Sequence, residues 1–135
     1  MKEEKHLEIL KEVLEEIETA LKDPRGLLAH QRRLAFSLSL GSVTLLELYL
    51  HKLQVIKEGS MIHHEWFKRK KETVLENLQA QIVAPVGTLP LLDKIVTLAI
   101  KLEEKRDDLA YGSPAKEEVL QEKINLFFKL QELMK

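Results

Sequence analysis

Apolar residues spaced three and four positions apart recur along almost the whole chain, and this spacing restricts the fold more than any other feature. The first run of this kind consists of Leu7, Leu10, Leu14, Ile17 and Leu21. Residues at such spacing share one face of an α-helix, whereas residues that share a face of a β-strand alternate. Strand-like alternation and internal repeats are absent from the sequence. The spacing therefore predicts an all-α protein.

Four short segments interrupt the apolar spacing, and each contains proline or glycine, the residues that most often end helices. These segments lie at 23–26, 57–60, 83–90 and 112–114. They divide the chain into expected helices at 3–22, 25–56, 61–81, 89–111 and 114–134. Short connections place consecutive helices side by side, so we expect an antiparallel, up-and-down bundle of about five helices. The length suits a single domain spanning residues 1–135.

The second expected helix is the longest and most apolar, which predicts a central position in the bundle. Gly41 indicates that a neighbouring helix approaches closely, because glycine costs roughly 1 kcal/mol relative to alanine in a helix. Polar residues interrupt the stretch Leu34–Leu50, so we expect a buried helix and no membrane span. Glu47 lies in this stretch. We expect Glu47 at the surface, and the alternative is that it is a buried partner of Arg106.

An arginine interrupts the apolar face of the fourth expected helix. The apolar members of that face are Leu92, Ile95, Ala99, Leu102 and Leu109. Arg106 occupies the position between the last two, which directs its side chain toward the inside of the bundle. A buried unpaired charge is costly, so two interpretations stay open. Either the Arg106 stem packs while its guanidinium reaches solvent, or Arg106 belongs to a functional polar site.

Other sequence features exclude several kinds of site. The chain has no cysteine, which excludes disulfides and thiol-ligated metals and fits a reducing, cytoplasmic environment. The adjacent His63 and His64 would diverge around a helix, so we expect both to be exposed and predict no metal site. The sequence contains no nucleophile elbow and no phosphate-binding glycine loop, and we predict no cofactor.

The net charge of −1 gives no overall electrostatic case for nucleic-acid binding, so any such case must be local. The third expected helix contains a basic run of Lys68, Arg69, Lys70 and Lys71. Such a run can contact the phosphates of RNA through sequence-independent attraction. Glutamates flank the run, so a solvated helix face is the alternative interpretation.

The segment from Leu102 to Gly112 resembles the signature helix of the HEPN superfamily, whose members are small all-α domains common in archaea and bacteria. The motif of that family is an arginine followed by a polar residue and, after a short spacer, a histidine. Arg106 matches the arginine and Asp107 the polar residue, while Tyr111 stands where the histidine is expected. The match in residues covers this segment, and the resemblance in helix number and motif position extends over the whole chain.

The resemblance implies a homodimer that brings two motif helices together. In active members the cleft between them is a metal-independent ribonuclease. Other members bind RNA without cleaving it, or partner a small nucleotidyltransferase in toxin–antitoxin pairs. The departure at Tyr111 matters because histidine titrates near neutral pH, whereas a phenol is a poor general base there. All five histidines lie outside the motif, and the sequence shows no evident replacement.

We therefore expect a non-catalytic, HEPN-like homodimer in the cytoplasm that binds RNA, nucleotide or a partner protein such as a small nucleotidyltransferase. Two alternatives stay open. One is an active endoribonuclease with Arg106, Asp107 and Tyr111 in its cleft, and the other is a purely structural or interaction bundle. For RNA contact we expect Arg106 together with the basic run at 68–71.

Overall fold

The computed structural model describes residues 3–134, and this part of the chain is built from helices. The α-helices are α1 (Glu3–Lys22), α2 (Gln31–Lys52), α3 (Lys71–Gln79), α4 (Leu92–Glu103), α5 (Arg106–Tyr111) and α6 (Glu117–Leu133). Three short 3-10 helices connect them: η1 (Leu27–His30), η2 (His64–Lys68) and η3 (Val86–Thr88). The described part contains one isolated β-bridge, between Ile56 and Ile82. The predicted all-α helical bundle is confirmed.

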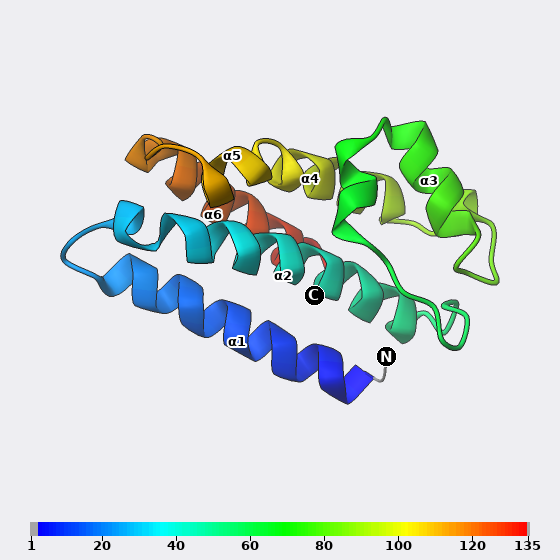
Figure 1. Cartoon of the computed structure of the whole chain (residues 1–135). Coiled ribbons are helices and arrows are strands. Elements are labelled where there is room, and N and C mark those ends of the chain that lie inside the picture. Colours follow the sequence, from blue (N-terminus) through cyan, green and yellow to red (C-terminus); the bar gives the residue numbers. More distant parts are fainter. Residues whose placement is uncertain (1–2, 135) are drawn as a thin grey trace.

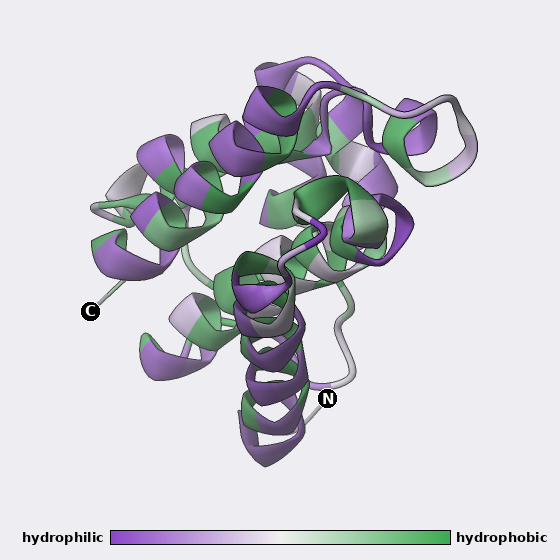
Figure 2. Ribbon diagram, turned by 90° about the vertical axis from the view of Figure 1, so that its left-hand side faces the viewer, coloured by the Kyte–Doolittle hydropathy of each residue, from purple (hydrophilic) through white to green (hydrophobic). Residues whose placement is uncertain are grey.

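The central position predicted for the second helix is confirmed. Figure 1 shows α1 running antiparallel beside α2, with α4, α5 and α6 on the opposite side of α2. The ten consecutive residues from 41 to 50 are all buried, so α2 is covered on every side over this stretch. Most residues along α1 are hydrophilic, as Figure 2 shows, and its buried Val13 and Ile17 provide its packed face. Apolar residues of all the long helices join one core cluster.

The close approach predicted at Gly41 is also confirmed. A Cβ atom added there would lie 2.6 Å from Cε1 of Phe127 on α6 and 2.9 Å from Cγ1 of Val13 on α1. The segment Leu27–Lys52 is long and apolar enough to cross a membrane by length and composition, and 72% of its apolar window is buried inside the fold. Packing against α1, α4 and α6 therefore accounts for the apolar sequence of α2.

The third expected helix, at 61–81, is only partly helical. Its first half is the short η2, and the extended backbone of Lys70 (ψ 148°) separates η2 from α3. The chain that follows α2 leaves the helix and pairs with the end of this region, where the N–H of Val83 donates to the carbonyl of Val55 at 2.7 Å. The second expected helix, at 25–56, is correspondingly shorter and begins in the 3-10 conformation of η1.

Glu47 is buried, so the prediction that it lies at the surface was wrong. The alternative partner was also wrong, because the contacts of Glu47 are His6 and Ile62 instead of Arg106. Its Oε2 lies 2.9 Å from Nε2 of His6, and its Oε1 accepts a hydrogen bond from the N–H of Ile62 at 3.0 Å. Burial raises the pKa of Glu47, and the bond from Ile62 partly offsets this rise. Glu47 thus joins α1, α2 and the segment that follows α2.

Candidate functional site

The helix expected at 89–111 is broken immediately before Arg106. Lys105 has a φ of 60°, in the left-handed region, and α5 begins at the next residue. Lys123 of α6 stabilises the break, because its Nζ donates to the carbonyls of Lys101 at 2.6 Å and Glu104 at 2.7 Å. Burial lowers the pKa of Lys123. The break turns α5 relative to α4, so Arg106 no longer continues the apolar face of one straight helix.

Arg106 packs its side chain and keeps hydrogen-bonding capacity. The side chain is 14% exposed, and its guanidinium carbon lies 4.8 Å from the centroid of the Phe36 ring. Its Nη1 donates to Oδ1 of Asp107 at 3.0 Å. Its Nε is buried and has no hydrogen-bond partner within the described part of the chain. The environment of Arg106 therefore combines a cation–π contact with a carboxylate partner.

The structure brings together two of the features predicted from separate parts of the sequence. Lys68, the first residue of the basic run, donates from Nζ to Oδ2 of Asp107 at 2.8 Å. Asp107 thus binds Arg106 and Lys68 at once, and the hydrogen bond from Lys68, followed by that from Arg106, lowers its pKa. Arg69 and Lys70 are exposed, and neither lines the hollows beside Arg106.

Lys71 does not reach the site. It lies at the start of α3, and its Nζ pairs with Oδ1 of Asp93 on α4 at 2.6 Å. The basic run therefore divides because the extended backbone at Lys70 ends η2 before α3 begins. Of its four residues, Lys68 is the one that contacts the motif helix α5.

Two shallow hollows meet at Arg106. One, of about 370 Å³, is polar and includes Lys68, Asp107 and Asp108. The other, of about 350 Å³, is largely apolar and is lined by Phe36, Ser39, Leu40, Val43, Ile62, His63, His64 and Arg106. Because Arg106 lines both hollows, it connects a charged surface with an apolar one.

Tyr111 lies beside these hollows and does not line them. Its side chain is among the most exposed large apolar groups of the chain, at 70%. Its ring packs edge-on against Phe36, with centroids 5.9 Å apart. Phe36 therefore contacts two of the predicted motif residues, Arg106 and Tyr111, whereas the third, Asp107, contacts Arg106; the sequence did not indicate a role for Phe36.

A histidine–carboxylate pair at the same place was missed from the sequence. His64 was expected to be exposed, but it is partly buried, and its Nδ1 lies 2.8 Å from Oε1 of Glu103. Glu103 is buried, and its Oε2 accepts a hydrogen bond from the hydroxyl of Ser39 at 2.9 Å. His64, Glu103 and Ser39 come from η2, α4 and α2, so no local motif in the sequence indicates this contact. Within the described residues, no group of three or more potential ligands could hold a metal ion.

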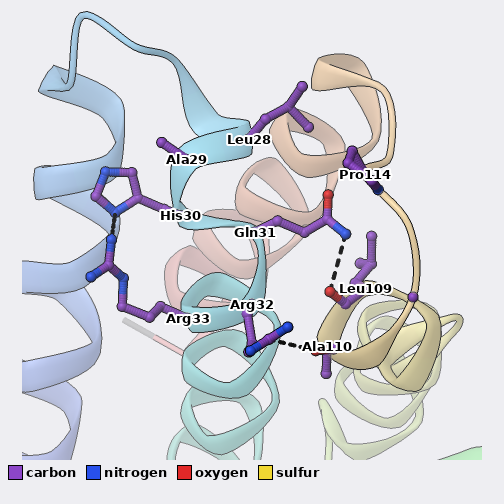
Figure 3. A pocket seen from close by; sticks show the side chains of 10 residues that line it. Leu28, Ala29, His30, Gln31, Arg32, Arg33, Leu109, Ala110 and Pro114 are labelled. Atoms are coloured by element: carbon purple, nitrogen blue, oxygen red, sulfur yellow. Dashed lines mark hydrogen bonds between the residues drawn. The ribbon is translucent and has the colours of Figure 1, made fainter.

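A third and larger hollow, of about 700 Å³, lies where α2 begins and α5 ends. Figure 3 shows Gln31 and Arg32 pointing from α2 toward the carbonyls of Leu109 and Ala110. The Gln31 amide donates to Leu109 at 3.1 Å, and Nε of Arg32 donates to Ala110 at 3.0 Å. The side chains of Gln31 and Arg32 thus fix the position of α5 against α2.

Comparisons with known proteins give no relative on which a family assignment could rest. No family model, curated protein or solved structure matches the chain. The resemblance of the motif helix to the HEPN superfamily therefore stays a prediction from the sequence, and the site is interpreted from its own geometry.

Proposed function

We propose that this protein is a homodimeric RNA-binding domain and that single-stranded RNA binds across the surface around Arg106. The observation that carries the proposal is the contact of Phe36 with both the Arg106 guanidinium and the exposed ring of Tyr111. Proteins that bind single-stranded nucleic acid combine exposed aromatic rings, on which bases stack, with cations that contact the phosphates.

Two cations at this surface could bind a phosphodiester. Arg106 and Lys68 share the single carboxylate of Asp107, so this group of three carries one excess positive charge, although Glu103, Glu104 and Asp108 also line the hollow. A guanidinium can bind two phosphate oxygens at once, and a phosphate would satisfy donors of Arg106 that Asp107 does not use. The rings of Phe36 and Tyr111 supply the adjacent stacking surface.

Arg106→Ala is expected to weaken the binding of a fluorescently labelled single-stranded RNA by about 10- to 100-fold. This corresponds to about 1.5–3 kcal/mol, the range for hydrogen bonds to charged groups. Fluorescence anisotropy at two salt concentrations measures the effect. The slope of log affinity against log salt concentration should become shallower by about 1, because a phosphate contact is lost.

Lys11→Ala is the matched control, because Lys11 is an exposed lysine on α1 and α1 packs against α2 on the side away from α5. It should bind RNA within about twofold of the wild type, as expected for a surface change remote from the site. Equal weakening by Lys11→Ala and Arg106→Ala would indicate diffuse attraction and would contradict a defined site at Arg106.

The homodimer is proposed from an exposed apolar face of α2. Leu40 of α2 is 49% exposed, and Met61, in the segment that follows α2, is 54% exposed, so this face lies beside the rings of Phe36 and Tyr111 and leaves them to the RNA. An uncovered group of large apolar side chains is typical of an interaction surface, and a second copy supplies an identical face for a two-fold contact. Arg106 lines the hollow beside Leu40, so such a dimer would place two RNA sites along one surface.

Leu40→Glu is expected to convert the dimer into a monomer, because a buried unpaired carboxylate at the two-fold interface is costly. Multi-angle light scattering at micromolar concentration measures the mass directly. Val83→Glu, at an exposed apolar residue in the loop after α3, provides the control and should leave the mass unchanged. A wild-type monomer would contradict the proposed dimer without affecting the RNA site.

A further inference from the structure

The hollow of about 700 Å³ between the start of α2 and the end of α5 is lined by cationic side chains. They include those of Arg32 and Arg33, and none of the described residues that line this hollow is acidic. The polar hollow beside Arg106, by contrast, contains both cations and carboxylates. A ligand in the larger hollow therefore meets arginines without meeting a competing carboxylate, which suits an anion.

The two arginines of the larger hollow differ in what they have left to bind. Arg33 is held toward α1, where its Nε lies 3.4 Å from Oε1 of Glu16 and its Nη2 donates to Nδ1 of His30 at 3.0 Å. Arg32 forms no ion pair within the described residues, and its Nε donates to the carbonyl of Ala110 at 3.0 Å. Figure 3 shows the two side chains pointing in different directions, one toward His30 and the other toward Ala110. Both Nη groups of Arg32 therefore keep their donors for a ligand.

Arg32 and Arg106 lie on either side of a ring pair, which consists of Phe36 and Tyr111. Along α2, Arg32 precedes Phe36 by one helical turn, and both residues are exposed. Along α5, Ala110, which Arg32 contacts, follows Arg106 by one turn, a rise of about 6 Å along the helix axis. The residues on both sides of Tyr111 in the chain line the larger hollow, whereas Phe36 lines a hollow of Arg106. The ring pair thus separates two guanidinium groups.

We propose that Arg32 binds a second phosphate of the RNA, so that one nucleotide has its base on the ring pair and its two flanking phosphates on Arg106 and Arg32. Along a strand, each base lies between two phosphates, which is the order in which the protein presents its cations and rings. The free Nη groups of Arg32 can bind oxygens of the second phosphate. This arrangement selects single-stranded RNA, because the bases of a duplex are stacked on one another and do not reach the rings.

This inference rests on the proposed function, because it requires RNA at Arg106. It goes beyond that function by assigning a second phosphate site, on α2, and a defined path for the strand between the two sites. Arg32 also fixes α5 against α2, so a loss of affinity alone would not distinguish a phosphate contact from that structural role. The dependence of binding on salt concentration makes this distinction, because it reports the number of phosphates that the protein neutralises.

Arg32→Ala is expected to weaken the binding of the labelled single-stranded RNA by about 10-fold, within the range for a hydrogen bond to a charged group. The slope of log affinity against log salt concentration should become shallower by about 1, and by about 2 when Arg106→Ala is added, because each arginine contacts one phosphate. Arg32→Lys keeps the charge and should retain the wild-type slope. Fluorescence anisotropy over a series of salt concentrations measures the affinity and the slope.

Arg33→Ala is the matched control, because it removes the same charge from the neighbouring position of α2, where the arginine is held by Glu16 and His30. It should leave the slope unchanged and the affinity within about twofold of the wild type. Equal weakening by Arg33→Ala and Arg32→Ala would indicate diffuse attraction and would contradict the second site. Weakening by Arg32→Ala at an unchanged slope would also contradict it, and would assign Arg32 the structural role alone.

The same measurements separate this inference from the proposed function. Wild-type affinity and slope for Arg32→Ala, together with a loss for Arg106→Ala, would overturn the inference and leave the proposed function intact. Absence of RNA binding by the wild-type protein, or a loss for Arg32→Ala without one for Arg106→Ala, would overturn the proposed function itself.

Discussion

Gly41→Leu is expected to lower the free energy of unfolding by about 3 kcal/mol or more. The added side chain would overlap atoms of the neighbouring helices, and these helices would have to move apart to make room for it. The first added atom would already lie 2.6 Å from Phe127 and 2.9 Å from Val13. Neither neighbour is the end of a long flexible side chain, and they belong to helices on different sides of α2. Relief of the clash therefore requires movement of α1, α6 or both.

Denaturant unfolding followed by circular dichroism measures this change. Gly87→Leu is the matched control, since an added Cβ at Gly87 meets nothing within 4 Å, and we expect its stability to change by less than about 0.5 kcal/mol. A Gly41→Leu protein as stable as the wild type would contradict the close packing of α1 and α6 on α2.

Glu47→Ala is expected to lower the free energy of unfolding by about 3 kcal/mol, because it leaves buried polar partners without an acceptor. The partners are His6 on α1 and the N–H of Ile62 beyond α2, so the substitution loosens two connections at once. Glu15→Ala, at an exposed glutamate of α1, should change stability by less than about 0.5 kcal/mol. Equal effects of the two substitutions would contradict the buried role of Glu47.

The raised pKa of Glu47 also predicts the direction of a pH effect. Burial raises the pKa above its ordinary value of 4.5, and the bond from Ile62 and the charges of His51 and His63 limit the rise. In the pH range above 4.5, up to the raised value, the folded protein therefore binds the proton more readily than the unfolded chain. The contribution of Glu47 to stability is present below this range and is lost as the pH rises through it. Glu47→Gln should abolish this decline, and denaturant unfolding at several pH values measures it.

The sequence was sufficient to predict the elements that depend on local pattern. Over the described residues the helix expected at 3–22 coincides with α1, and glycine at position 41 correctly indicated close helix packing. Glu47 was wrongly predicted to lie at the surface because glutamate is a charged residue, without regard to the apolar residues around it. A helix that is apolar on all sides is buried on all sides, so a residue in its middle is buried as well. That signal was present in the sequence of α2.

The candidate site depends on contacts that no local pattern contains. The break before Arg106 depends on Lys123, which caps carbonyls at the end of α4 from another helix. The pairing of His64 with Glu103 joins residues 39 positions apart, and so does that of Lys68 with Asp107. Helical spacing relates residues three or four positions apart, so it could identify Arg106, and the motif resemblance could identify Asp107, but neither could place His64 against Glu103.

Photo-cross-linking of bound RNA tests the central claim, that RNA lies on the surface around Arg106, most directly. The wild-type protein is saturated with single-stranded 2′-O-methyl RNA, irradiated and digested, and the cross-linked peptides are identified by mass spectrometry. We expect cross-links at Tyr111 and Phe36, the two rings beside Arg106, and we expect Arg106→Ala to reduce them. Cross-links confined to α1 or α3 at saturation, with none at Phe36 or Tyr111, would contradict the assignment of this surface as the RNA site.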